Sequence, residues 1–162
     1  MPLIKFFAVL IICSLAFSQS LMAKEIVIKF SHVTTEKTPT GKAAKYLQEL
    51  VEQRLNGKVR VDGYPNSQLY NDKEVLKALL LGDVQLAAPS LSKFGKYTKK
   101  WGLFDLPFLF KDNNAVACFT NGPQGQVLLD AASNKGLKGL GYWLNGMKQL
   151  SANKALIVPT DA

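Results

Sequence analysis

The chain has 162 residues, of which 48% are hydrophobic, and its formal net charge is +8. This length is enough for one compact domain with a single core. The one histidine has no cysteine or carboxylate cluster beside it, which excludes a zinc site, and the lack of a G-x-S-x-G motif argues against a serine hydrolase. The basic charge favours an anionic partner, whether a small acid, a nucleic acid or a lipid surface.

Residues 1–23 have the pattern of an export signal. Lys5 supplies a positive start, residues 6–17 are mostly apolar, and Ala23 is a small residue suited to a cleavage site. The apolar run is about a dozen residues, short of the roughly 20 that cross a bilayer, so an uncleaved anchor is the lesser alternative. We expect an exported mature chain that begins at Lys24 and is not stably inserted in the membrane.

Cleavage would leave Cys118 as the only cysteine, so no intrachain disulfide is expected. Cys118 lies within the apolar stretch 115–119, which predicts a helix and a buried structural thiol rather than a nucleophile. The mature chain would keep a net charge of +7, one less than the +8 of the whole chain, because Lys5 is the only charged residue before Lys24.

The first part of the mature chain predicts alternating strands and helices. Residues 25–31 are rich in β-branched and apolar side chains, which indicates a buried strand. Thr38 followed by Pro39 predicts the start of a helix, and Asn56 with Gly57 predicts its end. Residues 59–64 then predict a second strand.

A second helix and a third strand follow. Asn71, with Glu74 three residues later, resembles a capping box, and Gly82 predicts the helix end. Residues 84–89 predict the third strand. The order β-α-β-α-β is typical of a mostly parallel sheet with helices on its faces, so the fold class is α/β.

Lysines alternate with aromatic residues over residues 93–101. The spacing predicts an amphipathic helix with its lysines outward, and a nucleic-acid surface is the alternative. Residues 104–110 place five large apolar side chains around Asp105 and a proline. Core packing, with Asp105 holding backbone amides, and a hydrophobic binding patch are both compatible with that composition.

The last third predicts helices over residues 113–119 and 124–132. Strands are predicted over residues 137–144 and 147–151. Between them, Asn145 and Gly146 could form either a hairpin turn or a bend.

Four residues are candidate ligand contacts because of their positions in the predicted fold. Open α/β sheets bind ligands outside the carboxyl ends of their strands, and pockets combine apolar walls with a few polar groups. His32, Ser90 and Asn145 lie at predicted strand ends, and Trp143 could add an aromatic wall. Structural hydrogen bonding is the alternative role for His32, and satisfying backbone groups of a turn is the alternative for Ser90.

Four phrases occur in one order along the chain: Lys-Phe-Ser-His at 29–32, Tyr-Pro-Asn-Ser-Gln-Leu at 64–69, Leu-Phe-Asp-Leu-Pro-Phe-Leu-Phe at 103–110 and Tyr-Trp-Leu-Asn-Gly-Met-Lys-Gln at 142–149. Together they resemble the periplasmic solute-binding subunits of TRAP (tripartite ATP-independent) transporters, the C4-dicarboxylate-binding type in particular. The resemblance implies the first lobe of a two-lobed, type II-like periplasmic binding protein. Residues 24–151 would form an incomplete lobe I, residues 152–162 would begin the crossover strand, and lobe II would be missing.

The resemblance also implies a function. The expected ligand is a small organic acid such as succinate, malate or fumarate, and the expected partners are the membrane subunits of the transporter. The resemblance implies no enzymatic activity, no cofactor, no metal and no nucleic-acid partner. Lys154, in the context Asn-Lys-Ala-Leu at 153–156, matches a cation that could meet a ligand carboxylate, and an exposed lysine at a strand edge is its alternative role. A cleft with one lobe missing would bury less of the ligand, so we expect the chain to bind it weakly.

Two other functions remain open from the residues alone. The chain could be a small exported basic module that binds an anionic surface or nucleic acid. It could also be an exported hydrolase, although one histidine and one cysteine do not supply a recognisable nucleophile and base.

Overall fold

A computed structural model describes residues 25–147, 149 and 151–161 of the chain. The predicted export signal, residues 1–23, lies outside the described residues. The elements, in chain order, are β1 (Ile26–Ser31), α2 (Pro39–Leu55), β2 (Val59–Tyr64), α3 (Val75–Leu81), β3 (Leu86–Ala87), the 3-10 helices η1 (Leu91–Lys96) and η2 (Lys100–Asp105), α4 (Asn113–Asn121), α5 (Pro123–Leu129), and the 3-10 turns η3 (Ser133–Lys135) and η4 (Pro159–Asp161).

The three strands form one parallel sheet in the order β2-β1-β3. The pairing of β1 with β2 runs in register from Ile26 opposite Val59 to Ser31 opposite Tyr64. The prediction of a parallel α/β sheet is therefore confirmed. Because the strands are parallel, the residues that follow β1, β2 and β3 meet at one edge of the sheet.

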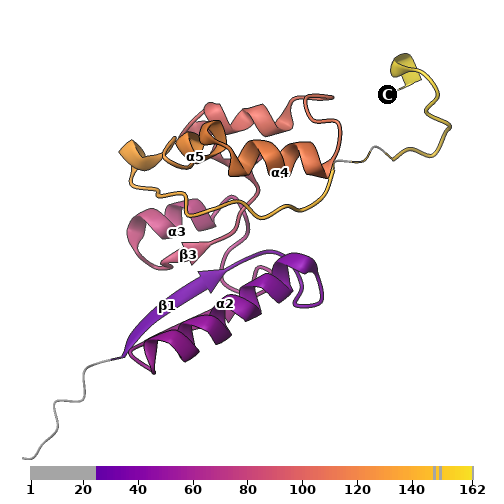
Figure 1. The fold of residues 1–162 in the computed structure, drawn as a ribbon. Coiled ribbons are helices and arrows are strands. Elements are labelled where there is room, and N and C mark those ends of the chain that lie inside the picture. The colour runs from indigo at the N-terminus through magenta and orange to yellow at the C-terminus, as the bar shows by residue number, and fades with distance from the viewer. Residues whose placement is uncertain (1–24, 148, 150, 162) are drawn as a thin grey trace, which may run out of the picture.

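The buried apolar side chains form two clusters. Helix α2 packs on the sheet through Ala44, against Phe30 and Val61. A second cluster joins α3 to the later helices, and its largest buried side chain is Trp101, whose Nε1 donates a 2.7 Å hydrogen bond to Leu128 O. Figure 1 shows β1 with α2 in the lower part of the molecule and α4 with α5 in the upper part.

The predicted caps at Thr38, Asn56 and Gly82 are confirmed, and the one at Asn71 is not. Thr38 Oγ1 accepts a hydrogen bond from the Gly41 amide at 3.1 Å, and Asn56 closes α2 in the left-handed conformation. Gly82 closes α3 with φ of 81°. Asn71 Oδ1 accepts from the Glu74 amide at 3.0 Å, although it caps the turn before α3 rather than the helix itself.

The predicted third strand over residues 84–89 is much longer than the observed one. Only Leu86 and Ala87 pair with β1. The side chain of Gln85 takes the place of a backbone acceptor, since its Oε1 accepts from the Lys29 amide at 3.0 Å. Val84 is buried in the helical cluster instead of the sheet.

The predicted strands over residues 137–144 and 147–151 are wrong for the described residues, in which neither stretch pairs with another strand. A strand needs a neighbour for its backbone groups, and β3 pairs only with β1 in the described sheet. The segment is held by other bonds: the Gly139 amide donates to Leu129 O at 3.1 Å, and Tyr142 Oη donates to Gly125 O at 2.8 Å. Residues 148 and 150 lie outside the described residues.

The amphipathic helix over residues 93–101 is replaced by η1 and η2. The face assignment was correct, because Phe94 and Trp101 are buried and the lysines are exposed. The helix type was wrong: Thr98 Oγ1 accepts from the Lys100 amide at 3.2 Å and interrupts the helical ladder between the two pieces.

The predicted helix over residues 113–119 is observed as α4, and the predicted helix over residues 124–132 is observed as the shorter α5. The prediction of a buried thiol was wrong, because Cys118 lies on the exposed side of α4. Among the described residues, no helix is long and apolar enough to cross a membrane.

Candidate functional site

The loops after β1 and β2 are tied together at the carboxyl-terminal edge of the sheet. The His32 amide donates to Tyr64 O at 3.1 Å, and His32 O accepts from the Ser67 amide at 3.1 Å. Asn66 and Ser67 adopt φ of 54° and 58°, a conformation that costs energy for residues other than glycine. The backbone of His32 therefore fixes a strained turn beside it, and strain of this kind is concentrated at functional sites.

The His32 ring is buried, with 5% of the residue exposed. Its Nδ1 lies 3.1 Å from Thr34 Oγ1, and its ring centroid lies 5.4 Å from that of Phe30. Burial lowers the pKa of His32 below its ordinary value, although hydrogen bonding with the Thr34 backbone and the charge of Glu36 act in the opposite direction. The neutral imidazole is therefore the form that this site favours, and it presents one donor or one acceptor to a ligand.

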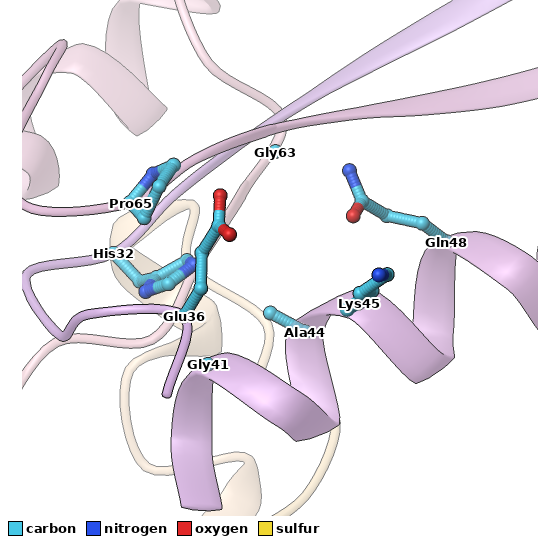
Figure 2. A pocket seen from close by; sticks show the side chains of 8 residues that line it. All are labelled: His32, Glu36, Gly41, Ala44, Lys45, Gln48, Gly63 and Pro65. Atoms are coloured by element: carbon cyan, nitrogen blue, oxygen red, sulfur yellow. The ribbon is translucent and has the colours of Figure 1, made fainter. Parts of the chain in front are cut away.

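A pocket of about 210 Å³ lies between His32 and helix α2. Its polar lining consists of His32, Glu36, Lys45 and Gln48, and the rest of its wall is small or apolar. Figure 2 shows the Glu36 carboxylate reaching into the space between His32 and Gln48. An imidazole, an amide, an ammonium and a carboxylate around one cavity can hold a small polar molecule through several hydrogen bonds.

The sequence reasoning did not identify the contribution of α2 to this pocket. Gly41, Ala44, Lys45 and Gln48 line it at spacings of three, four and seven residues, so they share one helix face. This spacing is present in the sequence, but a shared helix face does not by itself indicate a pocket. Glu36 comes from the loop before α2, whose course the sequence does not reveal.

Trp143 approaches the same edge of the sheet from the far end of the chain. Its ring lies 5.8 Å from that of Phe30 in an edge-to-face arrangement, and Phe30 also contacts His32. Trp143 remains 43% exposed, so part of its surface is free to meet a ligand. The structure thus brings two of the five predicted contacts, His32 and Trp143, around Phe30.

Ser90 follows β3 and precedes η1 on the exposed surface. Its amide donates to Asp72 Oδ2 at 3.2 Å, and its Oγ lies 3.0 Å from Ser92 Oγ. Neither bond joins the Ser90 hydroxyl to a backbone group, so its alternative role, satisfying backbone groups of a turn, stays a prediction. Asp72 was not singled out in the sequence, although it positions this loop.

Asn145 and Lys154 are both exposed. Neither lines the pocket beside His32, and Ser90 and Trp143 do not line it either. The five predicted contacts therefore do not form one closed site in the described part of the chain. Within that part, no group of three or more histidine, cysteine, aspartate or glutamate side chains could hold a metal ion.

A parallel α/β sheet with polar loops gathered at its carboxyl-terminal edge defines a ligand-binding lobe. The chain belongs to the bacterial extracellular solute-binding protein family 7 (DctP), whose model matches residues 30–162. It is 58% identical over 139 residues to the C4-dicarboxylate-binding periplasmic protein DctP of Vibrio cholerae, an alignment that covers 85% of this chain and 42% of the relative.

Two solved structures extend the comparison. A TRAP periplasmic solute-binding protein from Shewanella oneidensis with bound succinate is 56% identical, with a TM-score of 0.81 over 85% of this chain and 45% of that one. A second, from Pseudomonas aeruginosa with bound L-malate, is 49% identical, with a TM-score of 0.81 over 84% of this chain and 47% of that one. The chain thus spans less than half the length of these relatives.

These comparisons confirm the resemblance read from the four phrases and the predicted fold of one binding-protein lobe. The relatives named above are solute-binding proteins rather than enzymes. The comparisons do not favour a small basic interaction module as the function of the chain.

Proposed function

We propose that this chain contributes one lobe of a TRAP-type solute-binding protein and takes part in capturing a C4-dicarboxylate in the periplasm. The observation that carries the proposal is the match, over about 85% of the chain, to structures that hold succinate and L-malate. The net charge of +8 supports it, since a basic protein attracts a dianion. The membrane subunits of a transporter would be the partners that receive the ligand.

We assign the ligand contacts by chemistry. The buried His32 ring and the exposed face of Trp143 would form a wall beside Phe30, and Lys154 would supply a positive charge to a carboxylate. Ser90 and Asn145 would add a hydroxyl and an amide from neighbouring loops. Hydrogen bonds to charged groups contribute about 1.5–3 kcal/mol each, so the lysine contact would dominate.

Thermal unfolding of the chain with succinate, L-malate and fumarate tests the proposal. Butyrate is the matched control ligand, because it keeps the four carbons and has one carboxylate. A ligand that binds only the native state raises the melting temperature, and the shift grows with its concentration. Since the chain spans less than half of its relatives, the titration should extend to millimolar concentrations.

Site variants then test the assignment. Lys154→Gln should weaken dicarboxylate binding about tenfold or more, and Trp143→Ala should weaken it less, because an apolar contact is smaller than a charge-assisted bond. Lys135→Gln, at another exposed lysine, is the control and should bind as the parent does. A folded sample whose melting temperature responds to none of the three dicarboxylates would contradict the proposed function.

A further inference from the structure

A loop over residues 106–109 presents apolar side chains to solvent. Phe108 is 100% exposed, Leu106 is 55% exposed and Leu109 is 45% exposed. Phe108 also has φ of 59°, in the left-handed region that bulky residues avoid. Phe108 therefore combines two unfavourable features, an exposed aromatic ring and a strained backbone. An outlier of this kind points to a function.

Aromatic contacts close the base of this loop. The rings of Phe104 and Phe110, which flank it, stack with centroids 5.9 Å apart, and both contact Phe119 of α4 at 5.9 and 5.5 Å. The predicted core packing of residues 104–110 is thus correct for these two phenylalanines and not for the loop between them. Because these contacts already order the base of the loop, little conformational entropy is lost when the tip of the loop binds another surface.

Exposed lysines precede and follow the loop along the chain. Over residues 91–112, which we call the basic-apolar surface, five lysines outnumber two aspartates, and η1 packs against η2. One aspartate, Asp112, is engaged as the N-cap of α4. All five lysines are exposed: Lys93, Lys96, Lys99, Lys100 and Lys111.

We propose that the basic-apolar surface docks on an anionic lipid bilayer, with Phe108 inserted at the level of the headgroups and the lysines above it. An aromatic and leucine tip beside dispersed lysines suits a fluid, negatively charged surface, because apolar insertion and charge attraction add there. Docking on a bilayer would be an additional property of the chain and would not replace solute binding. An exported binding protein would thereby be held near the membrane in which its partners lie.

Sedimentation with vesicles tests this proposal without any organic acid, so its outcome is separate from that of the proposed function. The chain should partition onto phosphatidylcholine vesicles that contain about a third phosphatidylglycerol, and should partition far less onto pure phosphatidylcholine. Phe108→Ser should lower partition onto the anionic vesicles about tenfold. Val127→Ser, which removes another exposed apolar side chain on α5, is the matched control and should change it less than twofold.

Charge is tested by the double variant Lys99→Gln/Lys100→Gln, which should lower partition at least tenfold at low salt and much less at high salt. Lys135→Gln should have little effect. Because Phe108 is fully exposed, its variant should keep the parent melting temperature, which separates lost docking from lost folding. The proposal is overturned if Phe108→Ser binds as the parent does, if both vesicle types bind equally, or if single-stranded DNA binds more tightly than anionic vesicles.

Discussion

The side-chain amide of Gln48 lies directly over Gly63. Gln48 Nε2 donates a 3.0 Å hydrogen bond to Val61 O, and it lies 2.6 Å from the position that a Cβ on Gly63 would occupy. Helix α2 is thus joined to β2 by a polar contact that only a residue without a side chain permits. Both residues line the pocket beside His32, so the contact also shapes the candidate site.

The variant Gly63→Ala should displace the Gln48 amide and break its hydrogen bond to Val61. We expect the free energy of unfolding to fall by about 1 kcal/mol, the net contribution of one such bond. The measurement is urea unfolding of the parent, Gly63→Ala, Gln48→Ala and the double variant. If the alanine at 63 costs as much without Gln48 as with it, the steric relationship is not the cause.

Gly41 faces backbone rather than a flexible side chain. A Cβ on Gly41 would lie 2.1 Å from Thr35 O and 2.6 Å from Glu36 Cα, so the loop before α2 would have to move. We expect Gly41→Ala to lower the free energy of unfolding by about 2 kcal/mol or more, as overpacking does. Gly102→Ala is the control, since no atom lies within 4 Å of its Cβ position, and equal costs for the two variants would contradict the prediction.

Thr38 both caps α2 and closes the loop before it. Its Oγ1 accepts from the Gly41 amide at 3.1 Å and donates to Thr35 O at 2.7 Å. Thr38→Ala should therefore lower the free energy of unfolding by about 1 kcal/mol. Thr38→Ser keeps the hydroxyl and should restore most of that loss in the same urea experiment. A serine variant as unstable as the alanine variant would show that the methyl group, not the cap, matters.

The stability of the chain should depend on pH through His32. Burial holds the pKa of native His32 below its ordinary value of 6.5, so the unfolded chain takes up a proton at a higher pH than the native chain does. The stabilising contribution of the neutral ring is complete above about pH 6.5 and is lost as the pH falls through the pKa of the native state. The loss has a slope of at most about 1.4 kcal/mol per pH unit, the value for one proton.

His32→Gln removes this titration. Urea unfolding between pH 8 and 5.5 should show a shallower decline in the free energy of unfolding for the variant than for the parent. Thr34→Val, which removes the hydroxyl beside Nδ1 and leaves the histidine, is the companion variant and should retain a pH dependence in this range. Identical slopes for the parent and His32→Gln would mean that another group controls this range.

Local patterns predicted most of the first half of the fold. The β-branched runs of β1 and β2 and the cap residues Thr38, Asn56 and Gly82 gave correct boundaries, because they act through neighbours in the chain. Residues 137–144 were also predicted as a strand and form none. Their backbone pairing depends on a partner that the residues themselves do not supply.

For the candidate site, too, one part was predictable from the sequence and the other was not. The sequence by itself determined the binding-protein family, through four short phrases in a fixed order, and it placed His32 at the end of a parallel strand, where such sheets bind ligands. Only the tertiary structure brought Trp143 to Phe30, turned Glu36 and Gln48 into one pocket and left Phe108 exposed. Strand ends and caps follow from local sequence, whereas contacts between distant segments depend on how whole layers pack.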